Sequence, residues 1–146
     1  MIWRCAALAL VLAATSGCSR QPDDLDRAES ARAFPRAYRP VSRLGGNELG
    51  AEDQRDNLGE AQVVMDLANI RAGTTVADIG AGAGYYTVRL AERVGKKGRV
   101  LAQDIDPAAI QHLGQRVERE RLANVSIKLG APDDPRLPAG SFDRVF

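Results

Sequence analysis

Three glycines at alternate positions, Gly80, Gly82 and Gly84, form the part of this chain best suited to chemistry. Asp78 precedes them at the end of a short apolar run, and a helical pattern follows them. Because glycine has no side chain, it lets the backbone approach a ligand closely and adopts positive φ at low cost. The unpaired N–H groups and the dipole of a helix N-terminus add positive potential. This arrangement predicts a site for a small polar cofactor.

The spacing of the glycines separates two kinds of cofactor site. A dinucleotide fingerprint needs G-x-G-x-x-G, whose third glycine lets helix and strand pack closely. Here the spacing is G-x-G-x-G, and Tyr85 stands where that third glycine would be. The pattern therefore disfavours a nicotinamide-dependent oxidoreductase. A tight strand-to-helix turn that binds nothing is the plain alternative.

A second acid, Asp104, lies in an apolar run that reads as the next strand, residues 99–106. It follows the glycine loop by about 20 residues, the separation at which an acid on the second strand accepts hydrogen bonds from ribose hydroxyls. Asp106 precedes Pro107, so it is better explained as a helix N-cap than as a ligand. The only histidine, His112, lies in the helix that follows, and we assign it no catalytic role.

These residues resemble motifs I and II of class I S-adenosylmethionine (SAM)-dependent methyltransferases. The resemblance implies an α/β fold with a Rossmann-like doubly wound sheet, SAM as cofactor, and methyl transfer as the activity. It assigns the methionine end of SAM to Asp78 and the loop backbone, the ribose to Asp104, and the adenine to Ile105. The loop residues that it assigns to the cofactor are Gly80, Ala81, Gly82 and Gly84.

The segment 130–143 resembles the loop before the fourth strand in the same family, which has the form G-D-A-x-x-L-P-x-x-x-G-S-F-D. Ala131 stands where the family has an acid that contacts the adenine amine. Either Asp133 or Asp134 takes that role, or the backbone of Ala131 and Pro132 carries the contact alone. A solvated turn rich in proline and aspartate is an equally open interpretation of both aspartates.

Hydrophobic periodicity predicts the elements that must position these residues. The expected order is helix 57–70, strand 75–79, helix 85–94, strand 99–106, helix 107–121, strand 125–129 and the start of a strand at 142–146. Asn57 and Glu60 have the spacing of a capping box at the first helix. In the helix over 107–121 we expect one apolar face, with the charged Arg116 away from it.

The family resemblance also implies a sheet of order 3-2-1-4-5-7-6, of which the chain supplies three strands and the start of the fourth. The chain stops inside an apolar strand, whereas domain boundaries normally lie in exposed polar segments. We therefore expect residues 51–146 to be the N-terminal part of a methyltransferase domain in a longer protein. Alone they would be inactive and would bind SAM poorly. Neither a general base nor a methyl acceptor can be named from them.

The N-terminus carries a separate signal. A short basic start precedes an apolar run of about ten residues, the length of a signal-peptide core and too short to span a bilayer. Thr15-Ser-Gly-Cys18 resembles a bacterial lipoprotein cleavage box. We expect residues 1–17 to be a signal peptide, Cys18 to be lipidated and 18–50 to be a tether. A cleaved secreted protein and an uncleaved anchor are the alternatives.

The leader, the pair Arg55-Asp56 and the string at 76–87 make the chain similar to bacterial predicted methyltransferases that carry a signal sequence. We therefore expect an exported, periplasmic protein that is held at a membrane by its N-terminal lipid alone. Because SAM is a cytoplasmic metabolite, a non-catalytic lipoprotein that binds SAM or a nucleoside is the alternative function. The chain has 20 basic and 19 acidic residues without a basic patch, so we expect no nucleic-acid partner. The sequence shows no cluster of metal ligands.

Overall fold

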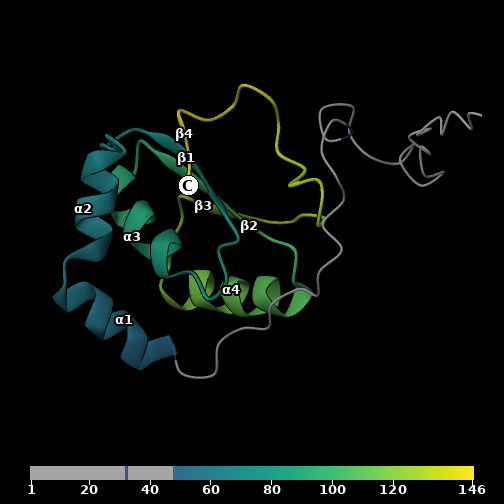
Figure 1. Ribbon diagram of the computed structural model, residues 1–146. Coiled ribbons are helices and arrows are strands. Elements are labelled where there is room, and N and C mark those ends of the chain that lie inside the picture. The colour runs from purple at the N-terminus through teal and green to yellow at the C-terminus, as the bar shows by residue number, and fades with distance from the viewer. Residues whose placement is uncertain (1–31, 33–47) are drawn as a thin grey trace, which may run out of the picture.

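A computed structural model describes Arg32 and residues 48–146 of the chain (Figure 1). The predicted signal peptide, Cys18 and the tether up to residue 47, Arg32 apart, lie outside these described residues. The first described helix, α1 (Glu48–Asn57), begins inside the segment predicted as a tether.

Four parallel strands form one sheet in the order β3-β2-β1-β4. They are β1 (Thr75–Ile79), β2 (Arg99–Asp104), β3 (Val125–Leu129) and β4 (Arg144–Val145). β1 lies in the middle, paired with β2 on one side and with β4 on the other. The chain therefore winds from β1 outward to β3 and then returns across β1 to β4. This order confirms the predicted Rossmann-like α/β fold, and it places a topological switch point between β1 and β4.

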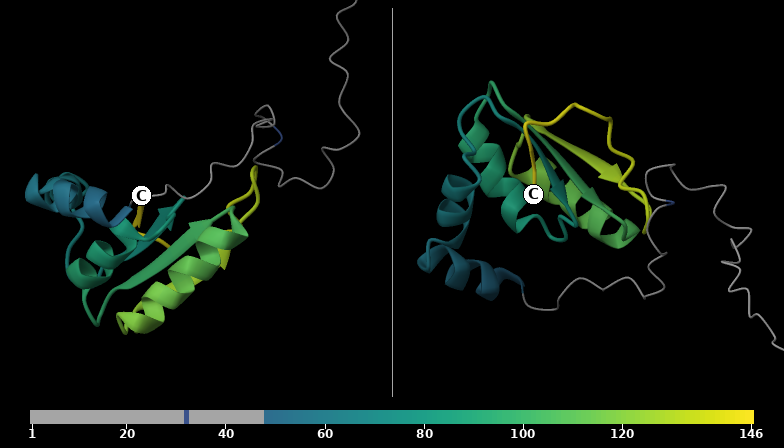
Figure 2. Two further views of the ribbon diagram at one scale, coloured as in Figure 1. Left: turned by 90° about the horizontal axis from the view of Figure 1, so that it is seen from below. Right: turned by 45° about the horizontal axis from the view of Figure 1, so that its top comes forward.

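Two helices make the crossovers that parallel strands require. α3 (Tyr85–Val94) joins β1 to β2, and α4 (Pro107–Arg119) joins β2 to β3. Figure 2 shows both helices on the same face of the sheet, as expected for successive crossovers of one hand in one direction. The core lies between this face, α3 and α2 (Glu60–Leu67), and it buries Ala61, Met65, Ile70, Val76, Tyr85, Leu90, Ala91, Val94 and Val100.

The single helix predicted over 57–70 is wrong in its boundaries. α1 ends at Asn57, and α2 begins only at Glu60. Between them Gly59 adopts the left-handed conformation, with φ of 65°, and caps α2 without a side-chain hydrogen bond. The predicted capping box at Asn57 therefore does not form, because glycine occupies the cap position itself.

The remaining predicted elements agree with the structure in order and type, with three differences in length. α4 ends at Arg119 and not at residue 121. β2 ends at Asp104 and not at residue 106, because Asp106 is the N-cap of α4 and accepts a 2.9 Å hydrogen bond from the N–H of Ala108. β4 is short, at Arg144–Val145. The prediction that Arg116 lies on the solvated side of α4 is also wrong, since only 9% of the surface of Arg116 is exposed. Among the described helices, none is long and apolar enough to cross a bilayer.

Candidate cofactor site

The loops that follow β1, β2 and β3 meet at one edge of the sheet, because the carboxyl ends of parallel strands share an edge. Two backbone hydrogen bonds join them. The N–H of Ala81 donates to the carbonyl of Gln103 at 2.9 Å, and the N–H of Gly130 donates to the carbonyl of Asp104 at 2.9 Å. The structure thus brings together the glycine loop, the second-strand acid and the 130–134 turn. Ligands of open α/β sheets bind at this edge, beside the switch point.

The glycine loop needs its glycines for two different reasons. Gly80, Gly82 and Gly84 all have positive φ, at 71°, 55° and 89°. A Cβ added at Gly80 would meet no atom within 4 Å, so open space lies over the loop there. A Cβ at Gly84 would lie 2.5 Å from Cδ1 of Leu113 in α4. Gly80 therefore leaves room at the surface, whereas Gly84 permits close helix packing.

The carboxylate of Asp104, which is predicted to bind ribose, also holds the glycine loop. Its Oδ2 accepts a 2.9 Å hydrogen bond from the N–H of Gly82, and its Oδ1 accepts one of 2.9 Å from the N–H of Asp106. A carboxylate offers about four lone-pair positions. These two bonds therefore fix the orientation of Asp104 and leave it able to accept two further hydrogen bonds from hydroxyl groups.

Asp78 is buried in β1, with 4% of its surface exposed. Its Oδ2 accepts a 2.6 Å hydrogen bond from the hydroxyl of Thr87, in the first turn of α3. Burial raises the pKa of the Asp78 carboxyl, the bond from Thr87 opposes this rise, and the nearby charge of Asp104 adds to it. In the structure Asp78 ties the strand to the helix across the glycine loop, and its contact with the methionine end of SAM stays a prediction.

The turn at 130–134 closes upon its own backbone. The N–H of Ala131 donates to the carbonyl of Asp134 at 2.7 Å, and the N–H of Asp134 donates back at 3.2 Å. Asp134 also accepts, through its carboxylate, a 2.8 Å bond from the N–H of Arg136. Pro132 is exposed, whereas Asp133 and the adenine candidate Ile105 are half-buried. The backbone of Ala131 is thus engaged within the turn, and a contact of this turn with an adenine amine stays a prediction.

A family model described as a methyltransferase domain matches residues 76–146. Nocamycin O-methyltransferase from Saccharothrix syringae is 38% identical over 58% of this chain and 30% of its own length. A protein-L-isoaspartate O-methyltransferase from Methanothrix thermoacetophila is 30% identical over 77% of this chain and half of its own. A SAM-dependent methyltransferase from Aquifex aeolicus superposes with a TM-score of 0.56 and 30% identity, over 59% of this chain and 46% of that one.

These matches support a class I SAM-dependent methyltransferase domain over residues 76–146. The chain spans half or less of the length of each of these relatives.

The donor and acceptor groups of the methyltransferase domain fit its family cofactor. Asp104 retains acceptor capacity where a ribose would offer two hydroxyl donors, and open space lies over Gly80. Among the described residues, no group of histidine, cysteine and acidic side chains could hold a metal ion. The edge is thus equipped for an organic cofactor with hydroxyl groups.

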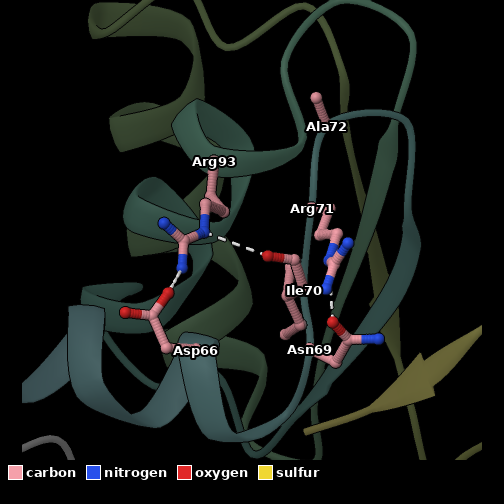
Figure 3. A pocket seen from close by; sticks show the side chains of 6 residues that line it. All are labelled: Asp66, Asn69, Ile70, Arg71, Ala72 and Arg93. Carbon is pink, nitrogen blue, oxygen red and sulfur yellow. Dashed lines mark hydrogen bonds and ion pairs between the residues drawn. The ribbon is translucent and has the colours of Figure 1, made fainter.

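The methyltransferase domain also has a cavity of about 500 Å³, which lies away from this edge. Figure 3 shows the six residues that line it. Four of them, at 69–72, lead into the start of β1, whereas the glycine loop follows the other end of that strand. The guanidinium of Arg93 crosses it to pair with Asp66 and to donate a 3.0 Å bond to the carbonyl of Ile70. The cavity is therefore not part of the cofactor site.

Sequence reasoning missed four charged residues of the methyltransferase domain that lie beside the glycine loop. They are Glu52 and Asp56 of α1, Arg89 of α3 and Arg116 of α4. The sequence indicates the pair Arg55-Asp56 only as a pattern shared with related chains. The spacing of Glu52 and Asp56, one helical turn apart, was the available signal, because it places two acids on one helix face.

Proposed function

We propose that the protein transfers a methyl group from SAM to an acceptor molecule, and that it does so outside the cytoplasm while anchored by a lipid. The observation that supports SAM as the cofactor is the hydrogen bond that joins the glycine loop to Asp104, at the edge of the sheet beside the switch point. The match to the methyltransferase family supports the reaction.

The described residues would act by binding and orienting the cofactor. Asp104 would accept hydrogen bonds from both ribose hydroxyls, and the backbone at 80–84 with Asp78 would hold the methionine end. Ile105 and the 130–134 turn would hold the adenine. SAM, when bound, supplies an electrophilic methyl group on its sulfonium. Holding that group in line with a nucleophile would by itself accelerate methyl transfer strongly.

Export and lipidation rest on the leader and on Cys18. An apolar core of signal-peptide length precedes a small-residue box that ends in cysteine. The other cysteine, Cys5, lies within the leader. After cleavage Cys18 would be the only cysteine among residues 18–146, which favours acylation over a disulfide within this segment.

Labelled SAM tests the reaction. The full-length protein, incubated with methyl-labelled SAM and an envelope extract of the producing bacterium, should transfer label to an extract component, and Asp104→Ala should reduce the transfer at limiting SAM. If the protein binds S-adenosylhomocysteine (SAH) and no component is ever labelled, the non-catalytic binding lipoprotein replaces the enzyme.

Metabolic labelling with palmitate tests the anchor. The wild-type protein should carry the label and sediment with membranes, whereas Cys18→Ser should lose both properties. A Cys5→Ser variant is the matched control and should keep them. Equal labelling of the wild-type protein and Cys18→Ser would contradict lipidation at this residue.

A further inference from the structure

We propose that α1 contributes to cofactor binding, because its residues Glu52 and Asp56 position the glycine loop through two arginines. This inference rests on the proposed function for its ligand, although the contacts that carry it are independent of any ligand. Glu52 and Asp56 lie one turn apart on α1 and both face the junction between the loop and α3. Figure 1 shows α1 beside α4 and the start of α3.

Arg116 connects Glu52 to the glycine loop. Its Nη1 donates to Glu52 at 2.6 Å and its Nη2 donates to the other carboxylate oxygen at 2.9 Å, so the ion pair is bidentate. The same Nη1 donates a 3.0 Å bond to the carbonyl of Ala83, inside the loop. Nε of Arg116 is held by Glu120 at 2.9 Å. Glu52 and Glu120 thus fix the position of the guanidinium against the loop.

Arg89 makes the matching contact on the other side of Gly84. Its Nη1 donates a 2.8 Å bond to the carbonyl of Tyr85 and lies 3.4 Å from Glu52. Its Nε donates to Asp56 at 2.7 Å, and its Nη2 also bonds that carboxylate. The hydroxyl of Tyr85 donates to Asp56 at 3.1 Å. α1 is therefore bonded to both sides of the junction.

The two carbonyls that the arginines hold belong to Ala83 and Tyr85, which flank Gly84. Gly84 has a φ of 89°, the conformation that turns the loop into α3. A loop whose carbonyls are fixed before binding loses less freedom when a ligand arrives. Since the Glu52–Arg116 pair is buried, removing the acid would leave the guanidinium against the loop with Glu120 as its remaining acidic partner.

The pKa values agree with this geometry. The hydrogen bond from Arg116 lowers the pKa of Glu52, burial opposes this, and the charges of Arg116 and Arg89 lower it further. Glu52 is therefore ionised at neutral pH. By linkage, a cofactor that binds the positioned loop must tighten the docking of α1 in equal measure.

The test replaces Glu52 by Gln in the full-length protein and measures two quantities. Calorimetry with SAH should show roughly tenfold weaker binding, which equals about 1.4 kcal/mol. Hydrogen exchange without ligand should show faster exchange of the amides at residues 81–85. Asp66→Asn is the matched control: it breaks an ion pair to α3 that lies away from the loop, so it should leave both quantities unchanged.

Binding of SAH by folded Glu52→Gln within twofold of wild type, with unchanged loop exchange, would overturn the inference. If Glu52→Gln does not fold, Glu52→Asp keeps the charge on a shorter arm and is judged by the same two measurements. If the wild-type protein binds no SAH, the proposed function fails, and loop exchange alone then decides the role of α1.

Discussion

The carboxylate of Asp104 accepts a 2.9 Å hydrogen bond from the backbone N–H of Gly82. The end of β2 and the glycine loop are therefore one hydrogen-bonded unit before any ligand arrives. This relationship links the two residues that the sequence pattern assigns separately to ribose and to methionine. Under the proposed function, a change at Asp104 would therefore affect the binding of both the ribose and the methionine end of SAM.

Replacing Asp104 by Ala should weaken SAH binding by about 1–3 kcal/mol, the scale of a lost hydrogen bond to a charged group. Calorimetry on the full-length protein measures the change. Asp106→Ala is the control: it removes the N-cap bond to Ala108 and should cost about 1 kcal/mol of stability without altering SAH affinity. An Asp104→Ala protein with wild-type affinity would show that this acid is not the ribose ligand.

The two outer glycines should respond differently to alanine. Gly84→Ala should lower the free energy of unfolding by about 2 kcal/mol or more, because it combines a strained φ with a contact to Leu113. Gly80→Ala carries only the backbone strain, since open space surrounds the added Cβ. Urea unfolding of both variants gives the comparison. Equal losses of unfolding free energy would mean that the close packing of Leu113 on Gly84 does not contribute to stability.

Asp78→Asn should keep or raise stability, because it removes a buried charge while retaining an acceptor for the hydroxyl of Thr87. The sign follows from the raised pKa of Asp78, which means that folding works against the ionised form. We expect the same variant to bind SAH more weakly if Asp78 holds the methionine end. Denaturant titration and calorimetry on one preparation separate the two effects, and a large stability loss would refute the charge argument.

Glu60 should contribute stability that disappears in acid. The hydrogen bond from Arg55, and then that from Tyr86, lower the pKa of Glu60 from 4.5 to about 2. When the pKa of a carboxyl is lower in the folded than in the unfolded state, its ionised form stabilises the fold. This stability is fully present above the pKa of the unfolded state and is lost as the pH falls towards the pKa of the folded state. The stability difference between wild type and Glu60→Gln should therefore shrink between about pH 5 and pH 2. A difference that stays constant across this range would exclude the ionised pair as its source.

The sheet and its helices were predictable because local signals agree. The strands at 75–79 and 125–129 and the helix at 85–94 have the predicted bounds, since a glycine directly follows each of them. Asp106 was recognised as a cap because Pro107 follows it. Where pattern, cap and turn chemistry point to the same structure, single-sequence reasoning reaches the element and its limits.

The contacts of α1 could not be predicted in the same way. Its described side chains meet the domain through charged groups rather than through an apolar face, so hydrophobic periodicity does not find it. The partner of Glu52 is Arg116, far along the chain, and a charged residue in a helix is ordinarily expected to be solvated. Only the tertiary fold shows that this arginine is buried beside the glycine loop.

The most direct test of the central claim is calorimetry of the full-length protein with SAM, SAH and NAD. We predict that SAM and SAH bind at one site with micromolar affinity, because Asp104 is set to hold a ribose beside the glycine loop. NAD should give no heat of binding, because Tyr85 occupies the position of the third glycine in the dinucleotide fingerprint. Binding of NAD without SAH, or binding of none of the three, would contradict the claim that the glycine-loop edge is a SAM site.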